Sequence, residues 1–284
     1  MFKKVILVFS FTLLFGCSAH IRENSFIAQD KEIINFSSAD LNSWKVLFPE
    51  HKLKPIQILT KNDSTLLRGL FLAHGSSEDV IFFIPGNGMK VSEGGIDAIQ
   101  TLAKLEKSIV IFDRRGSGAS EGEATISSLI SDSIDQYQFI KNELHASLVI
   151  VHGYSLGSFV AGQLAKNEPI DALVLQGSAT NVDDWIDKSI PWYTKPFLTV
   201  EVDEAFNAID NRVVVADYYK GPLFVIGAEN DEQVPVELSE LLFNASNSSN
   251  KELLIVEDAN HGNMLDNNKE LLIYKKFLTS INSL

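Results

Sequence analysis

The stretch LVIVHGYSLGSFVAGQLAK, residues 148–166, decides the fold. Its apolar start, Leu148 to Val151, is typical of a strand buried on both faces, and Ser155 to Lys166 predicts a helix. Between them Gly153-Tyr154-Ser155-Leu156-Gly157 matches G-x-S-x-G, which in this strand–turn–helix context lifts the serine hydroxyl above the sheet edge. The alternative is an ordinary turn with a serine facing solvent.

Outward from this stretch, short apolar runs alternate with helical patterns. Such alternation predicts an α/β fold with a mostly parallel sheet and helices on both faces. The sequence predicts eight strands, the first two an antiparallel pair: 55–60, 66–74, 80–84, 108–112, 148–151, 172–176, 223–227 and 253–256. The alternation stops between Gln176 and Leu223, where aromatic residues and prolines predict a small helical cap at about 179–220.

Composition excludes several classes of protein. The 284 residues include 24 basic and 37 acidic side chains, and the net charge of -13 argues against a nucleic-acid partner. The one cysteine excludes an internal disulfide framework and a cysteine-rich metal site. The histidines are scattered, and no glycine-rich nucleotide fingerprint follows a strand, so we expect no metal and no cofactor.

The N-terminus has the pattern of a targeting signal. Lys3 and Lys4 precede an apolar run, Val5 to Phe15, which is too short to span a bilayer and is typical of a signal-peptide core. Leu14-Phe15-Gly16-Cys17 resembles the bacterial lipobox, which implies cleavage after Gly16 and a lipid on Cys17. An uncleaved anchor and an ordinary signal peptide are the alternatives.

These observations divide the chain into a signal peptide, 1–16, a tether, 17–35, and one large domain, 36–284. Ser18 after the cysteine resembles the sorting signal for the outer membrane. We therefore expect a lipid-anchored protein of the bacterial cell envelope that faces the periplasm. The sequence leaves the oligomeric state open.

A serine hydroxyl needs an adjacent base to act as a nucleophile. His261 is the one histidine that follows a strand downstream of Ser155, and we expect it to be that base. The base needs a carboxylate to fix its tautomer, and Asp231, just after the strand 223–227, is the candidate. Glu229 and Glu232 are nearby alternatives.

Attack on a carbonyl creates an oxyanion, which needs preorganised N–H donors. The backbone N–H of Leu156 is one expected donor. The second should come from the loop after the strand 80–84, Pro85-Gly86-Asn87-Gly88, and we assign it to the Asn87 N–H. The alternative for this loop is a simple turn.

At these residues the chain resembles the α/β-hydrolase superfamily, and within it the group of serine aminopeptidases, monoacylglycerol lipases and protein depalmitoylases. The motif D-x-R-G-x-G-x-S-x-G of that group stands at Asp113 to Gly122, and D-x-x-V-P stands at Asp231 to Pro235. Two positions differ: Pro85 replaces a histidine and Arg114 a frequent tyrosine. The resemblance implies the α/β-hydrolase fold and a Ser-Asp-His triad.

Three functions are consistent with these residues. The favoured one is a serine hydrolase that cleaves a small-molecule carboxylic ester or thioester through an acyl-enzyme on Ser155. A peptidase of the aminopeptidase type is the enzyme alternative. The third is a non-catalytic, lipid-tethered binding protein on an inherited hydrolase fold. Arg114 and Arg115 could grip an anionic substrate, although Arg115 is expected to tie its loop to a local acid.

Overall fold

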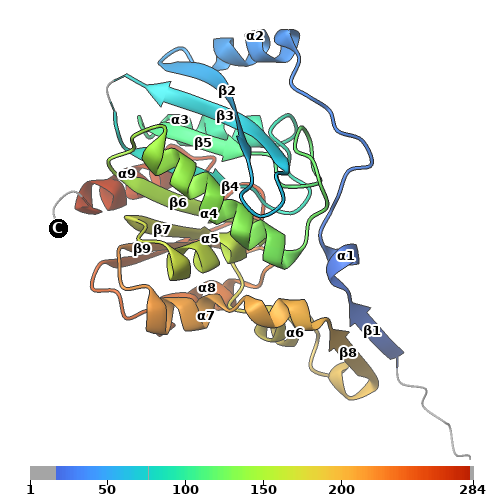
Figure 1. The fold of residues 1–284 in the computed structure, drawn as a ribbon. Helices are drawn as coiled ribbons and strands as arrows, with labels where there is room; N and C mark the ends of the chain where they lie inside the picture. The colour runs from blue at the N-terminus through green and yellow to red at the C-terminus, as the bar shows by residue number, and fades with distance from the viewer. Residues whose placement is uncertain (1–16, 76, 282–284) are drawn as a thin grey trace, which may run out of the picture.

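A single large sheet organises the molecule (Figure 1). The computed structural model describes residues 17–75 and 77–281, so the apolar run and the cleavage position inferred before Cys17 lie outside the described residues. In order across the sheet, the strands are β10 Lys251–Val256, β9 Leu223–Ala228, β7 Ala172–Gln176, β6 Val149–Tyr154, β4 Val80–Ile84, β5 Ser108–Phe112, β3 Leu66–His74 and β2 His51–Leu59.

The sheet confirms the predicted α/β architecture, including all eight strands. Strand β3 is antiparallel to both β2 and β5, while the pairs from β5 to β10 are parallel. The parallel strands β4, β5 and β7 are buried along their whole length, because helices cover both faces. Their carboxyl ends form the edge at which ligands gather in sheets of this kind.

Two apolar layers separate the sheet from its helices. Side chains of α4, α5 and α8 pack on one face, and those of α3 and α9 pack on the other. The helices are α1 Glu23–Phe26, α2 Ser38–Leu47, α3 Gly95–Ala103, α4 Ile126–Asn142, α5 Leu156–Asn167, α6 Val182–Ser189, α7 Asn211–Val213, α8 Val236–Ala245 and α9 Asn268–Ile281, with single turns at Lys195–Phe197, Glu204–Ala208 and Val214–Tyr218. Within the described residues, none of these helices has the length and hydropathy that crossing a membrane requires.

The cap between β7 and β9 contains more than the predicted helices. After α6 the chain forms the strand β8, Leu198–Val202, which pairs in parallel with β1, Cys17–Ile21. The resulting two-stranded sheet lies beside α6 at the lower end of the molecule (Figure 1). The sequence did not predict this pairing, because both strands are short and have no partner close in the chain.

Within residues 17–35, where the sequence predicts a tether, several residues contact the body of the molecule. Ile27 is only 2% exposed. The Asp30 carboxylate accepts a hydrogen bond from the Gly118 N–H at 2.8 Å, and the Asp30 N–H donates to the Gly116 carbonyl at 2.8 Å. The polar residues that suggested a solvated tether instead satisfy backbone groups of neighbouring loops.

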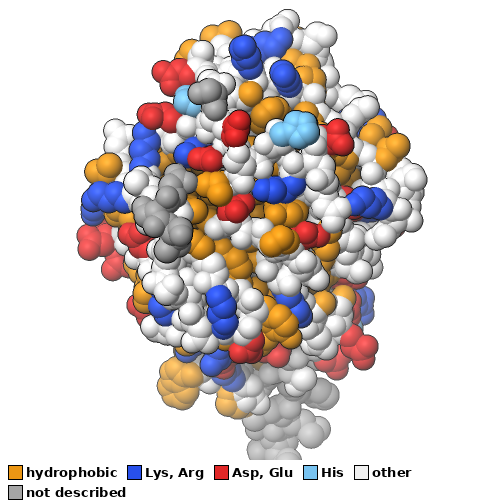
Figure 2. Space-filling model, turned by 60° about the vertical axis from the view of Figure 1, so that its left-hand side comes forward, with side chains coloured by type: hydrophobic (Ala, Val, Ile, Leu, Met, Phe, Trp, Pro, Cys, Tyr) orange, Lys and Arg blue, Asp and Glu red, His pale blue; other side chains and the backbone are white. Residues whose placement is uncertain are grey.

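On the face shown in Figure 2, basic, acidic and hydrophobic side chains are interspersed. This mixture is consistent with the composition.

Candidate active site

Ser155 occupies the sharp turn between β6 and α5. Its backbone has φ 52° and ψ -122°, a conformation that non-glycine residues rarely adopt and that costs about 1–3 kcal/mol. The turn places Ser155 directly before the first residue of α5. The structure therefore gives the G-x-S-x-G stretch the strained strand–turn–helix geometry that the sequence predicted.

The two glycines of the motif are required by close backbone contacts. A Cβ atom on Gly157 would lie 2.1 Å from the carbonyl oxygen of Ile84, at the end of β4. A Cβ atom on Gly153 would lie 2.5 Å from the carbonyl oxygen of Gly157. Both distances are far below van der Waals contact. Glycine at 157 therefore lets the turn around Ser155 pack against the end of β4, and glycine at 153 lets β6 pack against the first turn of α5.

Asp231 and His261 form a buried pair. The His261 Nδ1 lies 2.6 Å from the Asp231 Oδ2 and donates to it, because a carboxylate can only accept. The other carboxylate oxygen accepts hydrogen bonds from the backbone N–H groups of Gln233 at 2.9 Å and Val234 at 2.8 Å. The loop therefore holds the Asp231 carboxylate through Oδ1, and the hydrogen bond from His261 to Oδ2 sets the orientation of the imidazole.

The second nitrogen of His261 is available for proton transfer. Its Nε2 is buried and has no hydrogen-bond partner among the residues that the structure describes. The His261 ring packs against the Tyr154 ring, with centroids 5.2 Å apart, and its Cε1 lies close to Gly177. Because Tyr154 precedes Ser155 and Gly177 lines the cavity beside Ser155, the His261 ring belongs to the same region as the serine.

Asn87 and Leu156 both line the cavity next to Ser155. Leu156 is the first residue of α5, where a helix leaves its N–H groups without intrahelical acceptors. The Asn87 side chain has a role that the sequence did not reveal. Its Oδ1 accepts from the Ala28 N–H at 2.8 Å, and its Nδ2 donates to the Phe26 carbonyl at 2.6 Å. The predicted oxyanion loop is thereby fastened to the N-terminal segment.

The cavity beside Ser155 has a volume of about 170 Å³. Its wall combines the sheet edge, the cap and the N-terminal segment. Its apolar lining consists of Phe26, Leu156, Phe159, Ala179, Val182, Trp185 and Val234. A larger cavity of about 310 Å³ is lined by Tyr154 and His152 but not by Ser155, so the smaller cavity is the candidate substrate site.

Comparison with known proteins agrees with this geometry. A family model described as alpha/beta hydrolase fold matches residues 79–202. An esterase from Pyrococcus furiosus, Pf2001, superimposes with a TM-score of 0.68 at 19% identity, covering 89% of this chain and 99% of that chain. The protein has the α/β-hydrolase fold.

Two further proteins resemble this chain. The lysophosphatidylserine lipase ABHD12 of Danio rerio is 28% identical over 189 residues, covering 61% of this chain and 49% of that protein. The chain thus spans about half the length of this curated relative. A cold-adapted esterase from an Arctic intertidal metagenomic library superimposes with a TM-score of 0.56 at 15% identity, covering 83% of this chain and 93% of that chain.

The two arginines after β5 have different surroundings. Arg115 donates to Asp132 at 2.7 Å and 2.9 Å and to Asp63 at 2.5 Å, which ties its loop to local acids as expected. Arg114 is buried, its three nitrogens have no hydrogen-bond partner among the described residues, and burial lowers its pKa to about 10. Neither lines the Ser155 cavity, so the structure assigns neither to a substrate.

His152 belongs to the core of the protein, not to the candidate site. Its Nε2 lies 2.9 Å from the Gln176 Oε1, and its Nδ1 lies 3.2 Å from the Tyr274 hydroxyl. Burial lowers the pKa of His152 to about 4, so the ring stays neutral in the folded protein.

We expect His152 to make the protein less stable in acid. In the unfolded chain this ring binds a proton below its ordinary pKa of 6.5, whereas in the folded protein it does so only near 4. The free energy of unfolding should therefore fall by up to about 3 kcal/mol between pH 7 and pH 4 because of this group. Urea unfolding of wild type and His152→Gln at both pH values measures this change. The free energy of unfolding should fall less in the variant than in wild type.

Comparing wild type with His152→Gln separates the contribution of His152 from that of a second buried titratable group, Asp113. Burial raises the pKa of Asp113 to about 6, and this carboxyl stabilises the fold as the pH drops, with the opposite slope. Asp113 is present in both proteins, so its contribution cancels. An equal decrease in both proteins would show that His152 is protonated in the folded state.

Proposed function

We propose that this protein is a serine hydrolase that cleaves carboxylic esters or thioesters through an acyl-enzyme on Ser155. The observation that carries the proposal is the buried Asp231–His261 pair, in which the His261 Nε2 has no hydrogen-bond partner among the described residues. The His261 ring lies against Tyr154, the residue before the strained serine. The esterase and lipase named above support the ester as the bond cleaved. Because the curated relative is matched over only half its length, its own substrate is not carried over.

In the proposed mechanism, the Ser155 hydroxyl attacks the acyl carbonyl while the His261 Nε2 takes its proton. Asp231 stabilises the imidazolium through the hydrogen bond to Nδ1. The backbone N–H groups of Asn87 and Leu156 bind the oxyanion. The imidazolium then protonates the departing alcohol or thiol, and a water molecule activated by His261 releases the acid and restores the serine.

The lining of the cavity indicates an apolar acyl group of modest size. Its volume of about 170 Å³ is below the range of about 300–1,000 Å³ typical of drug-sized ligands, and most of its wall is hydrophobic. We further propose that Cys17 carries the lipid anchor in the cell envelope, on the strength of the sequence that precedes it.

The proposal is tested with the full chain in detergent and nitrophenyl esters from acetyl to palmitoyl. We expect hydrolysis with an optimum at short acyl chains, and covalent labelling of Ser155 by a serine-reactive phosphonate. Aminoacyl amides are assayed in parallel. Turnover of amides without turnover of any ester would replace the esterase proposal by the peptidase.

Phe26 should limit the acyl-chain length. Its ring closes the cavity from the N-terminal segment and packs edge-on against Trp185 at 6.1 Å and Phe206 at 5.3 Å. In Phe26→Ala we expect the ratio of kcat/KM for octanoyl over butyryl ester to rise about tenfold, because a deeper pocket accepts more methylene groups. The matched control is Phe36→Ala, because this phenylalanine packs against Trp44 and does not line the cavity. If both variants keep the wild-type ratio, Phe26 does not bound the acyl site.

A further inference from the structure

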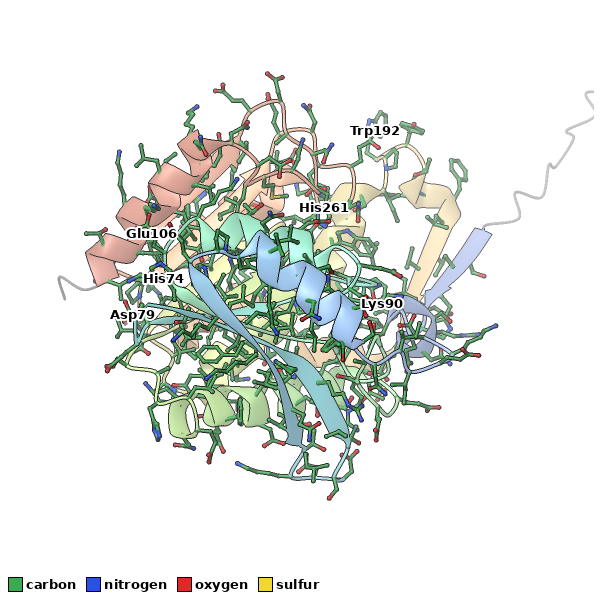
Figure 3. All side chains as sticks on the ribbon, turned by 90° about the horizontal axis from the view of Figure 1, so that it is seen from above. His74, Asp79, Lys90, Glu106, Trp192 and His261 are labelled. Atoms are coloured by element: carbon green, nitrogen blue, oxygen red, sulfur yellow. The ribbon has the colours of Figure 1, made fainter. Side chains whose placement is uncertain are left out.

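The loop between α6 and β8 exposes three aromatic side chains within six residues. Trp192 is 80% exposed, Tyr193 60% and Phe197 51%. The rings of Trp192 and Tyr193 contact each other at 6.0 Å, and Trp192 projects from the outer edge of the cap (Figure 3). Scattered single apolar residues on a surface are normal, but a contiguous group of large ones marks an interaction site. We refer to residues 190–197 as the aromatic loop.

The N-terminus emerges beside this loop. Leu198, which directly follows Phe197, pairs in register with Cys17, the first residue that the structure describes. Figure 1 shows β1 and β8 side by side at the end of the molecule opposite α2. The sequence immediately before Cys17 is the apolar run Val5 to Phe15, so a membrane-seeking segment or a lipidated cysteine leaves the domain next to the aromatic loop.

We propose that the aromatic loop docks on the surface of a lipid bilayer and inserts its rings at the level of the headgroups. Tryptophan and tyrosine prefer this level, because their rings are apolar at one end and polar at the other. The strand pair between Cys17 and Leu198 fixes the loop beside the anchor. The orientation of the whole protein on the membrane is thereby set by two contacts instead of one flexible attachment.

Charge favours a zwitterionic surface over an anionic one. The chain carries a net charge of -13, which anionic lipids repel. Lys195, within the loop, is paired with Asp187 at 2.5 Å. The contact should therefore depend on burial of the aromatic rings and should change little with salt.

Docking would bring the candidate substrate site close to the membrane. Helix α6 carries Trp185 in the wall of the Ser155 cavity and leads into the aromatic loop. Its eight residues span about 12 Å, so the cavity wall would lie within about one helix length of the headgroups. This consequence rests on the proposed function and predicts substrates that reside in the bilayer, whereas docking itself does not depend on catalysis.

The test reads the position of Trp192 directly. The full chain is reconstituted into vesicles of phosphatidylcholine with or without bromine on the acyl chains, which quenches nearby tryptophan fluorescence. We expect brominated lipid to quench the wild-type protein, and most of that quenching to disappear in Trp192→Phe. The variant keeps an aromatic ring at this position, so its loop should still dock on the membrane. It loses only the tryptophan whose quenching is measured.

Trp44→Phe is the matched control, because Trp44 lies on α2 at the opposite end of the molecule. It should leave the quenched part of the emission intact. Equal quenching in wild type and Trp192→Phe, or none in either, would overturn the proposal. A detergent-solubilised dimer that dissociates in Phe197→Ser would also overturn it, because the loop would then be an interface between copies of the chain. The readout is fluorescence, so an inactive enzyme would not affect it.

Discussion

Ser155→Ala is expected to lower kcat for nitrophenyl esters by about 10⁴-fold or more, because it removes the nucleophile and leaves only binding and the oxyanion donors. Steady-state hydrolysis by the full chain measures kcat, and unfolding curves show that the variant is folded. Ser155→Gly provides a second comparison. Both variants should be inactive, but glycine adopts the φ of 52° without strain, so its free energy of unfolding should exceed that of Ser155→Ala by about 1 kcal/mol.

Undiminished hydrolysis by Ser155→Ala would mean that another group attacks the substrate. Equal stability of the alanine and glycine variants would mean that the turn relaxes when the hydroxyl is removed. The two outcomes are independent, since one concerns the chemistry and the other the backbone.

Asp231→Asn should reduce kcat by roughly 10³–10⁴-fold while the protein stays folded. Two backbone N–H groups, from Gln233 and Val234, donate to one carboxylate oxygen. The introduced amide must therefore turn its oxygen toward them and its NH₂ toward His261. The His261 Nδ1 then has to accept, which moves the ring proton to Nε2 and removes the base from the serine. The pH–rate profile and kcat are measured together.

Asp258→Asn is the matched control for Asp231. Asp258 lies near His261 in sequence and has φ 57°, a conformation that asparagine tolerates as well as aspartate. We expect wild-type kcat in this variant. If Asp258→Asn loses as much activity as Asp231→Asn, the imidazole is oriented by a different carboxylate from the one in hydrogen-bond contact.

The sheet and the sharp turn at Ser155 could be predicted because the sequence patterns that specify them are local. Runs such as Val80 to Ile84 can only be stable buried on both faces, and the glycines around Ser155 admit one tight turn. Chain order then places Asp231 and His261 at the same sheet edge, and the structure brings them within 2.6 Å. Their catalytic roles remain predictions for the experiments above.

The parts that the sequence did not predict depend on long-range contacts. Glu23 and Asp30 look like solvated residues of a tether, yet their carboxylates accept hydrogen bonds from the N–H groups of Ile126 and Gly118. Such contacts join residues about ninety or more positions apart, and no local pattern reveals them. The same holds for Asn87, whose backbone was predicted to face the substrate while its side chain serves the N-terminal segment.

The two hydrogen bonds from the Asn87 side chain to Phe26 and Ala28 set a boundary for recombinant expression. A shortened protein that starts at Ser37, the residue that caps helix α2, would lack one wall of the cavity and both partners of that side chain. One that starts at Ser18 retains them, along with nearly all of the strand β1. Shortening the chain from its N-terminus past Phe26 would therefore remove part of the candidate site itself.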